Sequence, residues 1–232
     1  MARHSARGTR CRLLAVAGLL SLWLPYHSHA SMDVPRLQRE RSIPILGVTL
    51  SAQGPVGVVT TVDMYFEVRQ DQSGLMVVFP RGTGKFSPKA ETSVQQAIYR
   101  SARAANLSPD SWTVRLSAPH DVTVYGDSLS AMVGLTVIAL ARNESILDGR
   151  IITGGIAPDG QITRVGGLSL KLAAANRAHI RRVLVPDEMD PSEADWQTPF
   201  LMHVSRVGSI QQAYLALTGH SLLAGNTHQS PA

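Results

Sequence analysis

Cysteine and aromatic side chains are scarce in this chain of 232 residues. Cys11 is the only cysteine, and it lies in a leader-like segment, so the rest of the chain has neither a disulfide nor a thiol nucleophile. Basic residues do not form a cluster interleaved with aromatics, which is the pattern typical of nucleic-acid binding. Histidines and carboxylates also lack the spacing of metal ligands, so we expect no cofactor.

Residues 1–30 have the pattern of a secretory signal peptide. Four arginines precede the apolar run LLAVAGLLSLWL, and the segment ends at the small-residue site Ser28-His29-Ala30. The run is shorter than the roughly twenty apolar residues that a membrane-spanning helix needs. We therefore expect export to the periplasm or secretion, and membrane anchoring by an uncleaved segment is the alternative.

The leader also explains most of the formal net charge of +5. Without its four arginines, 18 of the 22 basic residues remain against 17 acidic ones. A nearly neutral protein has no electrostatic reason to bind nucleic acid, so we expect no such partner.

The remaining 202 residues suit a single domain. Residues 31–42 lack an apolar period and are interpreted as a linker, and residues 43–219 as the folded domain. The polar stretch 220–232 is typical of a disordered tail.

Strand-like and helix-like patterns alternate irregularly along the domain, which favours an α+β fold with mixed sheets packed against helices. The expected strands are 45–52, 56–68, 74–80, 112–119, 149–157, 182–186 and 202–207. The expected helices are one within 81–106, then 128–143, 168–178 and 209–219. The helix 128–143 is apolar almost all round, so we expect it to be buried between other elements.

Ser128, in YGDSLSA, and Lys171, in GGLSLKLAAA, are the candidate catalytic residues. A serine hydroxyl is a poor nucleophile near pH 7 unless a base takes its proton, and a desolvated lysine amine can be that base. Free lysine titrates near 10.4, so this role needs a pKa lowered to roughly 7 to 8. The ordinary alternatives are that Ser128 caps a helix and that Lys171 is solvated.

Four blocks of sequence together resemble the proteolytic domain of Lon proteases, in the same order along the chain. GTGKFSPKAETSVQQAI is similar to that family's glycine-lysine segment, and YGDSLSA stands in the place of its GPSAG serine motif. ITGG, with Thr153, resembles its TGE segment. The most specific block is DGQITRVGGLSLKLAAANRAHIRRVLVP, which follows the family pattern over its whole length.

The resemblance implies a Ser-Lys dyad of Ser128 and Lys171, with Thr153 orienting the amine. Backbone amides around Gly126 to Ser128, at the start of a helix, are the expected oxyanion hole. The family's substrates imply cleavage of unfolded polypeptides, and its domains imply a homo-oligomer. The chain contains no complete nucleotide-binding motif, so we expect a stand-alone, exported enzyme that works without its own ATPase or with a separate partner that delivers substrate.

Asp127 occupies the position where the family motif has proline. A carboxylate close to Lys171 would stabilise the ammonium and raise its pKa, whereas one that points to solvent or caps the helix would not. The first alternative function is therefore a catalytically impaired binding module with the same fold.

A second alternative comes from VYGDSLSA itself, which resembles the nucleophile block of secreted GDSL esterases. That family places the block near the start of its domain and supplies aspartate and histidine from a late D-x-x-H, which is missing here. Phosphoryl transfer is disfavoured, because GTGK is not a complete Walker motif.

Overall fold

The computed structural model describes residues 38–80, 84–119, 121–188 and 201–222, which all fall within one compact unit, Pro35–Ala232. The described strands are β1 (Gln38–Ser51), β2 (Gly54–Val68), β3 (Met76–Val78), β4 (Lys85–Phe86), β5 (Trp112–Ser117), β6 (Thr123–Val124), β7 (Arg150–Ile152), β8 (Gly155–Ile156), β9 (Ile162–Thr163), β10 (Arg182–Pro186) and β11 (His203–Val207). The described helices are α1 (Pro88–Ala104), α2 (Ser130–Arg142), α3 (Leu168–Arg177) and α4 (Ile210–Thr218). None of these helices has the length and hydropathy required to cross a membrane.

The strands form two main sheets and two short pairs. The larger sheet has the order β1-β2-β5-β3, in which the first two pairings are antiparallel and β3 runs parallel to β5. The second sheet has the order β11-β10-β7 and is parallel. Strand β4 pairs with β6 in parallel, and β8 pairs with β9 in an antiparallel manner. Mixed sheets with helices between and beside them confirm the predicted α+β class.

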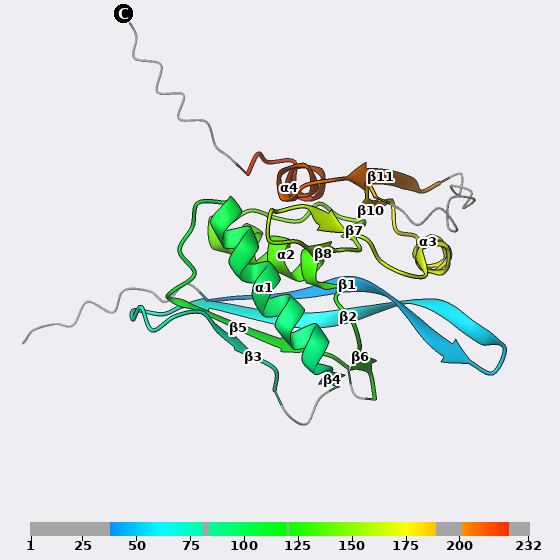
Figure 1. Ribbon diagram of the computed structural model, residues 1–232, viewed down its shortest axis with the longest axis horizontal. Helices are drawn as coiled ribbons and strands as arrows, with labels where there is room; N and C mark the ends of the chain where they lie inside the picture. The colour runs from blue at the N-terminus through cyan, green and yellow to red at the C-terminus, as the bar shows by residue number, and fades with distance from the viewer. Residues whose placement is uncertain (1–37, 81–83, 120, 189–200, 223–232) are drawn as a thin grey trace, which may run out of the picture. The chain divides into compact units, whose positions relative to one another are not determined.

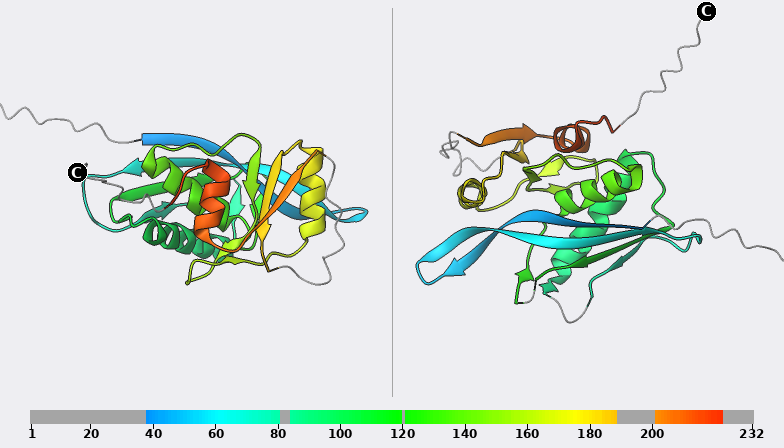
Figure 2. Two further views of the ribbon diagram at one scale, coloured as in Figure 1. Left: turned by 90° about the horizontal axis from the view of Figure 1, so that it is seen from above. Right: turned by 180° about the vertical axis from the view of Figure 1, so that it is seen from behind.

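The two main sheets lie on opposite sides of a helical layer (Figure 1). Helices α1 and α2 cover one face of the four-stranded sheet, and the three-stranded sheet with α4 lies beyond α2. The view from behind in Figure 2 shows the same order, with the β1–β2 hairpin extending past the end of the sheet beneath α3. Contacts of α3 with β2 and β1 hold this hairpin against the helix.

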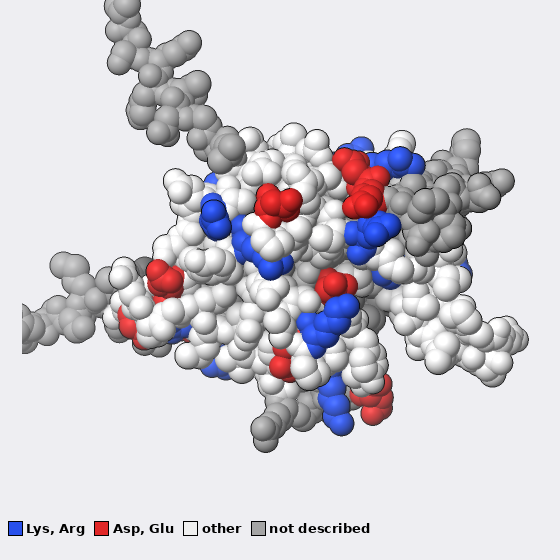
Figure 3. Space-filling view, in the orientation of Figure 1, with Lys and Arg blue, Asp and Glu red and all other residues white. Residues whose placement is uncertain are grey.

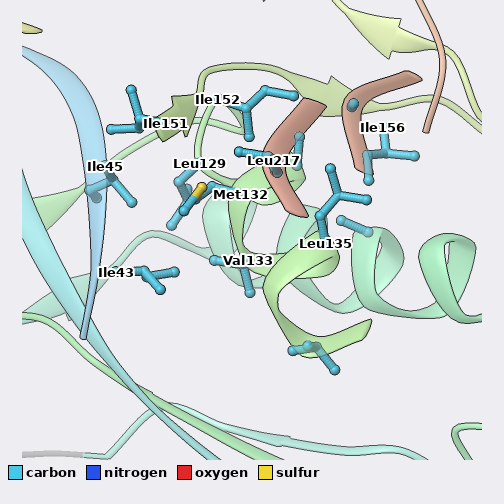
Figure 4. Packing of buried hydrophobic residues seen from close by; sticks show 14 of the residues in the cluster. Ile43, Ile45, Leu129, Met132, Val133, Leu135, Ile151, Ile152, Ile156 and Leu217 are labelled. Carbon is cyan, nitrogen blue, oxygen red and sulfur yellow. The ribbon is translucent and has the colours of Figure 1, made fainter. Parts of the chain in front are cut away.

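Helix α2 lies in the centre of the core, as its sequence predicts. Every residue from Ser130 to Leu140 is buried, because elements pack on all sides of the helix. Figure 4 shows Met132, Val133 and Leu135 of α2 among isoleucines from β1 and β7. This packing fixes the end of the β6–α2 loop, which carries Ser128.

Helix α1 lies within the range 81–106 where a helix was expected. Pro88 stands at the first helical position, and the hydroxyl of Ser87 accepts a hydrogen bond from the amide of Ala90 at 3.2 Å. Its buried side is formed by small and branched residues that include Val94, Ile98 and Ala102.

The strand expected over 149–157 is instead two strands that belong to different sheets. Strand β7 ends at Ile152, and β8 begins at Gly155 and pairs with β9. Between them, Gly154 hydrogen-bonds to the start of α2: its amide donates to the carbonyl of Ser128 at 2.9 Å, and its carbonyl accepts from the amide of Ala131 at 3.1 Å. The apolar pattern of a strand does not reveal this change of partner.

Both predicted boundaries of the domain need correction. Strand β1 begins at Gln38, so residues 38–42, which were expected in the linker, pair with the end of β2. At the other end, Leu222 is 1% exposed, and a guanidinium nitrogen of Arg142 donates to its carbonyl at 2.5 Å. The rest of the expected tail and the expected signal peptide lie outside the described residues.

Candidate active site

Ser128 lies in the loop between β6 and α2 and is half-buried. The helix begins at Ser130 with Leu129 as its N-cap, and no side chain makes a capping hydrogen bond there. The interpretation of Ser128 as a helix cap is therefore wrong. Its backbone carbonyl accepts a hydrogen bond from the amide of Gly154 at 2.9 Å.

The backbone around Gly126 is arranged to present amide groups. Gly126 has φ of +77°, a conformation that glycine adopts readily, and no described atom lies within 4 Å of the position that a Cβ would take there. Among the described residues, the amides of Gly126, Asp127 and Ser128 donate to no protein acceptor. Unpaired amides in open space can bind a developing negative charge.

Asp127 pairs with a residue that sequence reasoning missed. Its carboxylate lies 3.6 Å from Nζ of Lys89, near the start of α1, and the two side chains are 43% and 69% exposed respectively. Water screens such a pair, which contributes at most about 1 kcal/mol to stability. Lys89 carried no local signal for this contact, because the two residues are 38 positions apart in the chain.

Thr153 is completely buried, at 0% exposure. Its amide donates to the carbonyl of Leu184 on β10 at 3.1 Å, and it directly precedes Gly154, which hydrogen-bonds to Ser128. Within the described part of the chain, the Thr153 hydroxyl has no hydrogen-bond partner. A buried polar group in this state calls for an explanation, and a catalytic partner is one.

Lys171 is buried on α3, with 4% of its surface exposed. Lysine is seldom buried to this extent, so the interpretation of Lys171 as an ordinary solvated residue is wrong. Its amide donates to the carbonyl of Gly167 at 3.0 Å as part of the first turn of α3.

Gly57 on β2 sets the position of the backbone that carries Lys171. A Cβ on Gly57 would lie 1.9 Å from the carbonyl oxygen of Leu170 and 3.1 Å from the amide nitrogen of Lys171. Only glycine allows α3 to approach the strand this closely. The signal for this contact was present in the sequence as an isolated glycine within a strand pattern, but the pattern does not identify the neighbour.

Gly57→Ala is expected to lower the free energy of unfolding by about 1–3 kcal/mol, because α3 has to move away from β2. Gly47→Ala on the neighbouring strand is the matched control: its Cβ would meet only the side chain of Val58, at 3.4 Å. Urea unfolding followed by circular dichroism measures both changes. Equal effects of the two substitutions would show that the close approach at Gly57 is unimportant.

The structure joins only some of the predicted site residues directly. Backbone hydrogen bonds link the Ser128 loop to the Thr153–Gly154 segment, and Gly126 and Asp127 precede Ser128 in the same loop. Lys171 comes from a different element, α3, which packs against β2 and β1. The pairing of its amine with the hydroxyl of Ser128 stays a prediction.

Two hollows in the described part of the chain lie away from the candidate site. One hollow on the outer face of the four-stranded sheet is lined by residues that include Asp63 and Arg115, and another is lined by Tyr99 of α1 and Ile210 of α4. Neither contains Ser128 or Lys171. Figure 3 shows acidic and basic side chains intermixed on the visible face.

The esterase alternative needs a histidine as base. His179, His203 and His220 are exposed, and His120 lies outside the described residues. No group of three histidine, cysteine or acidic side chains in the described ranges could hold a metal ion.

Comparison with known proteins finds one family repeatedly. The model of the Lon protease (S16) C-terminal proteolytic domain matches residues 85–199, a segment that contains Ser128, Thr153 and Lys171. The archaeal Lon protease of Halobacterium salinarum is 28% identical over 134 residues, 54% of this chain and 19% of that protein. The archaeal Lon protease of Thermococcus kodakarensis is 30% identical over 106 residues, 45% of this chain and 16% of that protein.

Lon protease 2 of Hydrogenovibrio crunogenus is 36% identical over 76 residues, 32% of this chain and 9% of that protein. The chain thus spans less than a fifth of the length of these curated relatives. Its similarity to them concerns the proteolytic part, and the sequence blocks that indicated the family lie within or beside the matched segment. Residues 85–199 of this chain are thus similar to the Lon protease C-terminal proteolytic domain.

Proposed function

We propose that this chain is a serine endopeptidase that cleaves unfolded polypeptides through a Ser128–Lys171 dyad. The observation that carries the proposal is the burial of Lys171, at 4% exposure, within the same family-matched segment as Ser128. Lysine is rarely buried to this extent in proteins, and a buried position is where a lysine base is expected. Similarity to a protease family supplies the reaction type.

In the proposed reaction, Nζ of Lys171 takes the proton of the Ser128 hydroxyl as Oγ attacks the peptide carbonyl. The resulting oxyanion binds the free amides around Gly126 to Ser128, whose neighbouring helix α2 adds its dipole. Lys171 then returns the proton to the leaving amine as the C–N bond breaks. Water, deprotonated by the same amine, hydrolyses the acyl-enzyme and restores both residues.

Thr153 is the proposed positioning residue for the amine. Its hydroxyl is buried and has no hydrogen-bond partner within the described part of the chain, so it is available to accept a hydrogen bond from a neutral or charged Nζ. Its backbone links it both to β10 and, through Gly154, to Ser128. Such an anchored hydroxyl is suited to fixing the direction of a flexible lysine side chain.

Asp127→Asn is expected to leave the pH midpoint of kcat/KM unchanged to within about 0.3 unit. The carboxylate of Asp127 lies beside Lys89 in a partly exposed position, where water screens its effect on other charges. The measurement is a pH–rate profile of the variant beside the wild type. A midpoint that falls by about one unit would instead mean that Asp127 stabilises the ammonium of Lys171 and suppresses the base.

The proposed peptidase works on loose polypeptides without ATP, because its sequence carries no complete nucleotide-binding motif. The leader-like pattern of residues 1–30 supports action outside the cytosol. We further propose that the domain assembles with copies of itself or with a separate protein that delivers substrate.

The test of the proposed function is incubation of the purified protein with an unfolded, fluorescently labelled polypeptide in the absence of ATP, across roughly pH 7 to 10. Internal cleavage products identified by mass spectrometry are the expected result. Hydrolysis of short acyl esters without peptide cleavage would establish the esterase instead. Binding of the polypeptide without cleavage at any pH would establish the noncatalytic module.

A further inference from the structure

Within the described residues, strand β2 has a stretch that pairs with another strand on one side only. It pairs with β1 from Gly54 opposite Ser51 to Glu67 opposite Gln38. Its pairing with β5 on the other side covers only Asp63 to Val68. Residues 58–62, which lie between Gly57 and the start of the β5 pairing at Asp63, are called the β2 edge gap.

The pairing of β2 with β5 shows which way the backbone amides and carbonyls of the β2 edge gap point. The amide of Arg69 donates to the carbonyl of Ser111 at 2.6 Å, which continues the ladder between β2 and β5. Main-chain groups alternate between the two sides of an antiparallel strand, so the odd-numbered residues of β2 face the β5 side. The amides and carbonyls of Val59 and Thr61 therefore point away from β1, to the side where β5 is absent.

Both ends of the gap are closed by specific contacts. At one end β5 turns away after Ser117, and the carbonyl of Ala118 accepts from the amide of Gly84 at 2.9 Å instead. At the other end α3 lies against Gly57, whose carbonyl accepts from a guanidinium nitrogen of Arg177 at 2.9 Å. The five residues of the gap span about 16 Å at a rise of roughly 3.3 Å per residue.

The gap lacks the features that usually protect a free strand edge. Its sequence is Val-Val-Thr-Thr-Val, with no charged residue and no proline, and all five residues are β-branched. Natural sheets commonly place lysine, proline or a bulge on an open edge to prevent pairing with another chain. Thr61 is exposed and Val59 is half-buried, and no described strand pairs with either residue on the β5 side.

We propose that the β2 edge gap binds an extended segment of the polypeptide substrate as an added strand. The argument for this occupant is continuity with the candidate site: Gly57, next to the gap, contacts the backbone of Leu170 and Lys171. An unfolded polypeptide supplies the matching row of amides and carbonyls whatever its sequence. The inference rests on the proposed function, because it deepens the account of how that site receives its substrate.

The gap is tested by Thr61→Pro, which removes an amide on the free side without taking a hydrogen bond from β1. Thr61→Val is the matched control, since it changes the side chain and keeps the amide. Binding of a labelled unfolded peptide is measured by fluorescence anisotropy in a Ser128→Ala background, so the result does not depend on cleavage. We expect Thr61→Pro to raise the Kd roughly fivefold to tenfold and Thr61→Val to leave it within about twofold. Equal affinities would overturn the proposal.

A second measurement uses the Ser128→Ala protein without any change in β2, which removes concern over misfolding of the proline variant. Peptides methylated at one backbone nitrogen at a time are compared for binding. Strand addition predicts loss of affinity at every second residue, because alternate amides face the partner strand. Uniform tolerance, or loss without this alternation, would contradict the inference.

The gap could alternatively pair with the same gap of a second copy. Sedimentation equilibrium would then show a dimer that Thr61→Pro dissociates, with peptide affinity unchanged, and this outcome would overturn the substrate role. Failure of the peptidase proposal gives a different result. The Ser128→Ala protein would still lose affinity for peptides methylated at every second backbone nitrogen, but the wild type would cleave no polypeptide.

Discussion

Ser128→Ala is expected to reduce the cleavage of unfolded polypeptide by about 10³-fold or more, because the substitution removes the proposed nucleophile. The fold is expected to be retained, since Ser128 is half-buried and its hydrogen bond with the amide of Gly154 is made by the backbone carbonyl. Substrate binding is also expected to persist, so the loss lies in kcat. The measurement is the initial rate of peptide release, with anisotropy of the same substrate as the readout of binding.

Ser130→Ala is the matched control for this prediction. Ser130 lies two residues further on, but it is 1% exposed as the first residue of α2, and its amide donates to the carbonyl of Asp127 at 2.9 Å. A hydroxyl enclosed in this way cannot reach a substrate without opening the helix. Loss of cleavage in Ser130→Ala together with full activity in Ser128→Ala would mean that Ser130, and not Ser128, is the nucleophile.

Lys171→Met is expected to cause a loss of similar size, about 10³-fold, because no base then takes the serine proton. Methionine has a flexible, unbranched side chain close to that of lysine in length, and it suits a buried position. A thermal melt checks that the variant is folded. Lys89→Met, on a side chain that is 69% exposed, is the control for loss of a lysine as such.

Lys171→Arg separates the role of a base from the role of a positive charge. A guanidinium keeps the charge, but it stays protonated at any workable pH and cannot accept the proton. We expect this variant to be as inactive as Lys171→Met. Substantial activity in Lys171→Arg would mean that the buried cation acts by electrostatic stabilisation, and that Ser128 is activated by another group.

The sequence predicted those features that depend on local pattern and chemistry. The period of the apolar residues Val94, Ile98 and Ala102 predicted the helix that forms α1. The all-round apolarity of α2 predicted its burial, and the β-branched runs predicted β2 and β10. The α+β class followed from such patterns, because side-chain periodicity is a property of the chain itself. The similarity to Lon proteases came from the resemblance of four sequence blocks.

Other features depended on which distant segments meet, and local pattern contains no record of that. Thr153 and Gly154 leave the strand pattern because they hydrogen-bond to β10 and to the Ser128 loop. Asp127 lies beside Lys89, which no spacing rule indicated. The start of β1 at Gln38 also went unrecognised, since the polar residues there gain strand structure from pairing with β2.

The sequence by itself thus determined the residue types of the candidate site and the kind of fold that carries them. Tertiary structure decided the environment of each group: whether Lys171 is buried, where the amides of the Ser128 loop point, and which edge of β2 is left open. The physical reason is that periodicity and local chemistry are encoded by neighbouring residues. Burial and hydrogen-bond partners instead arise from contacts between segments far apart in the chain.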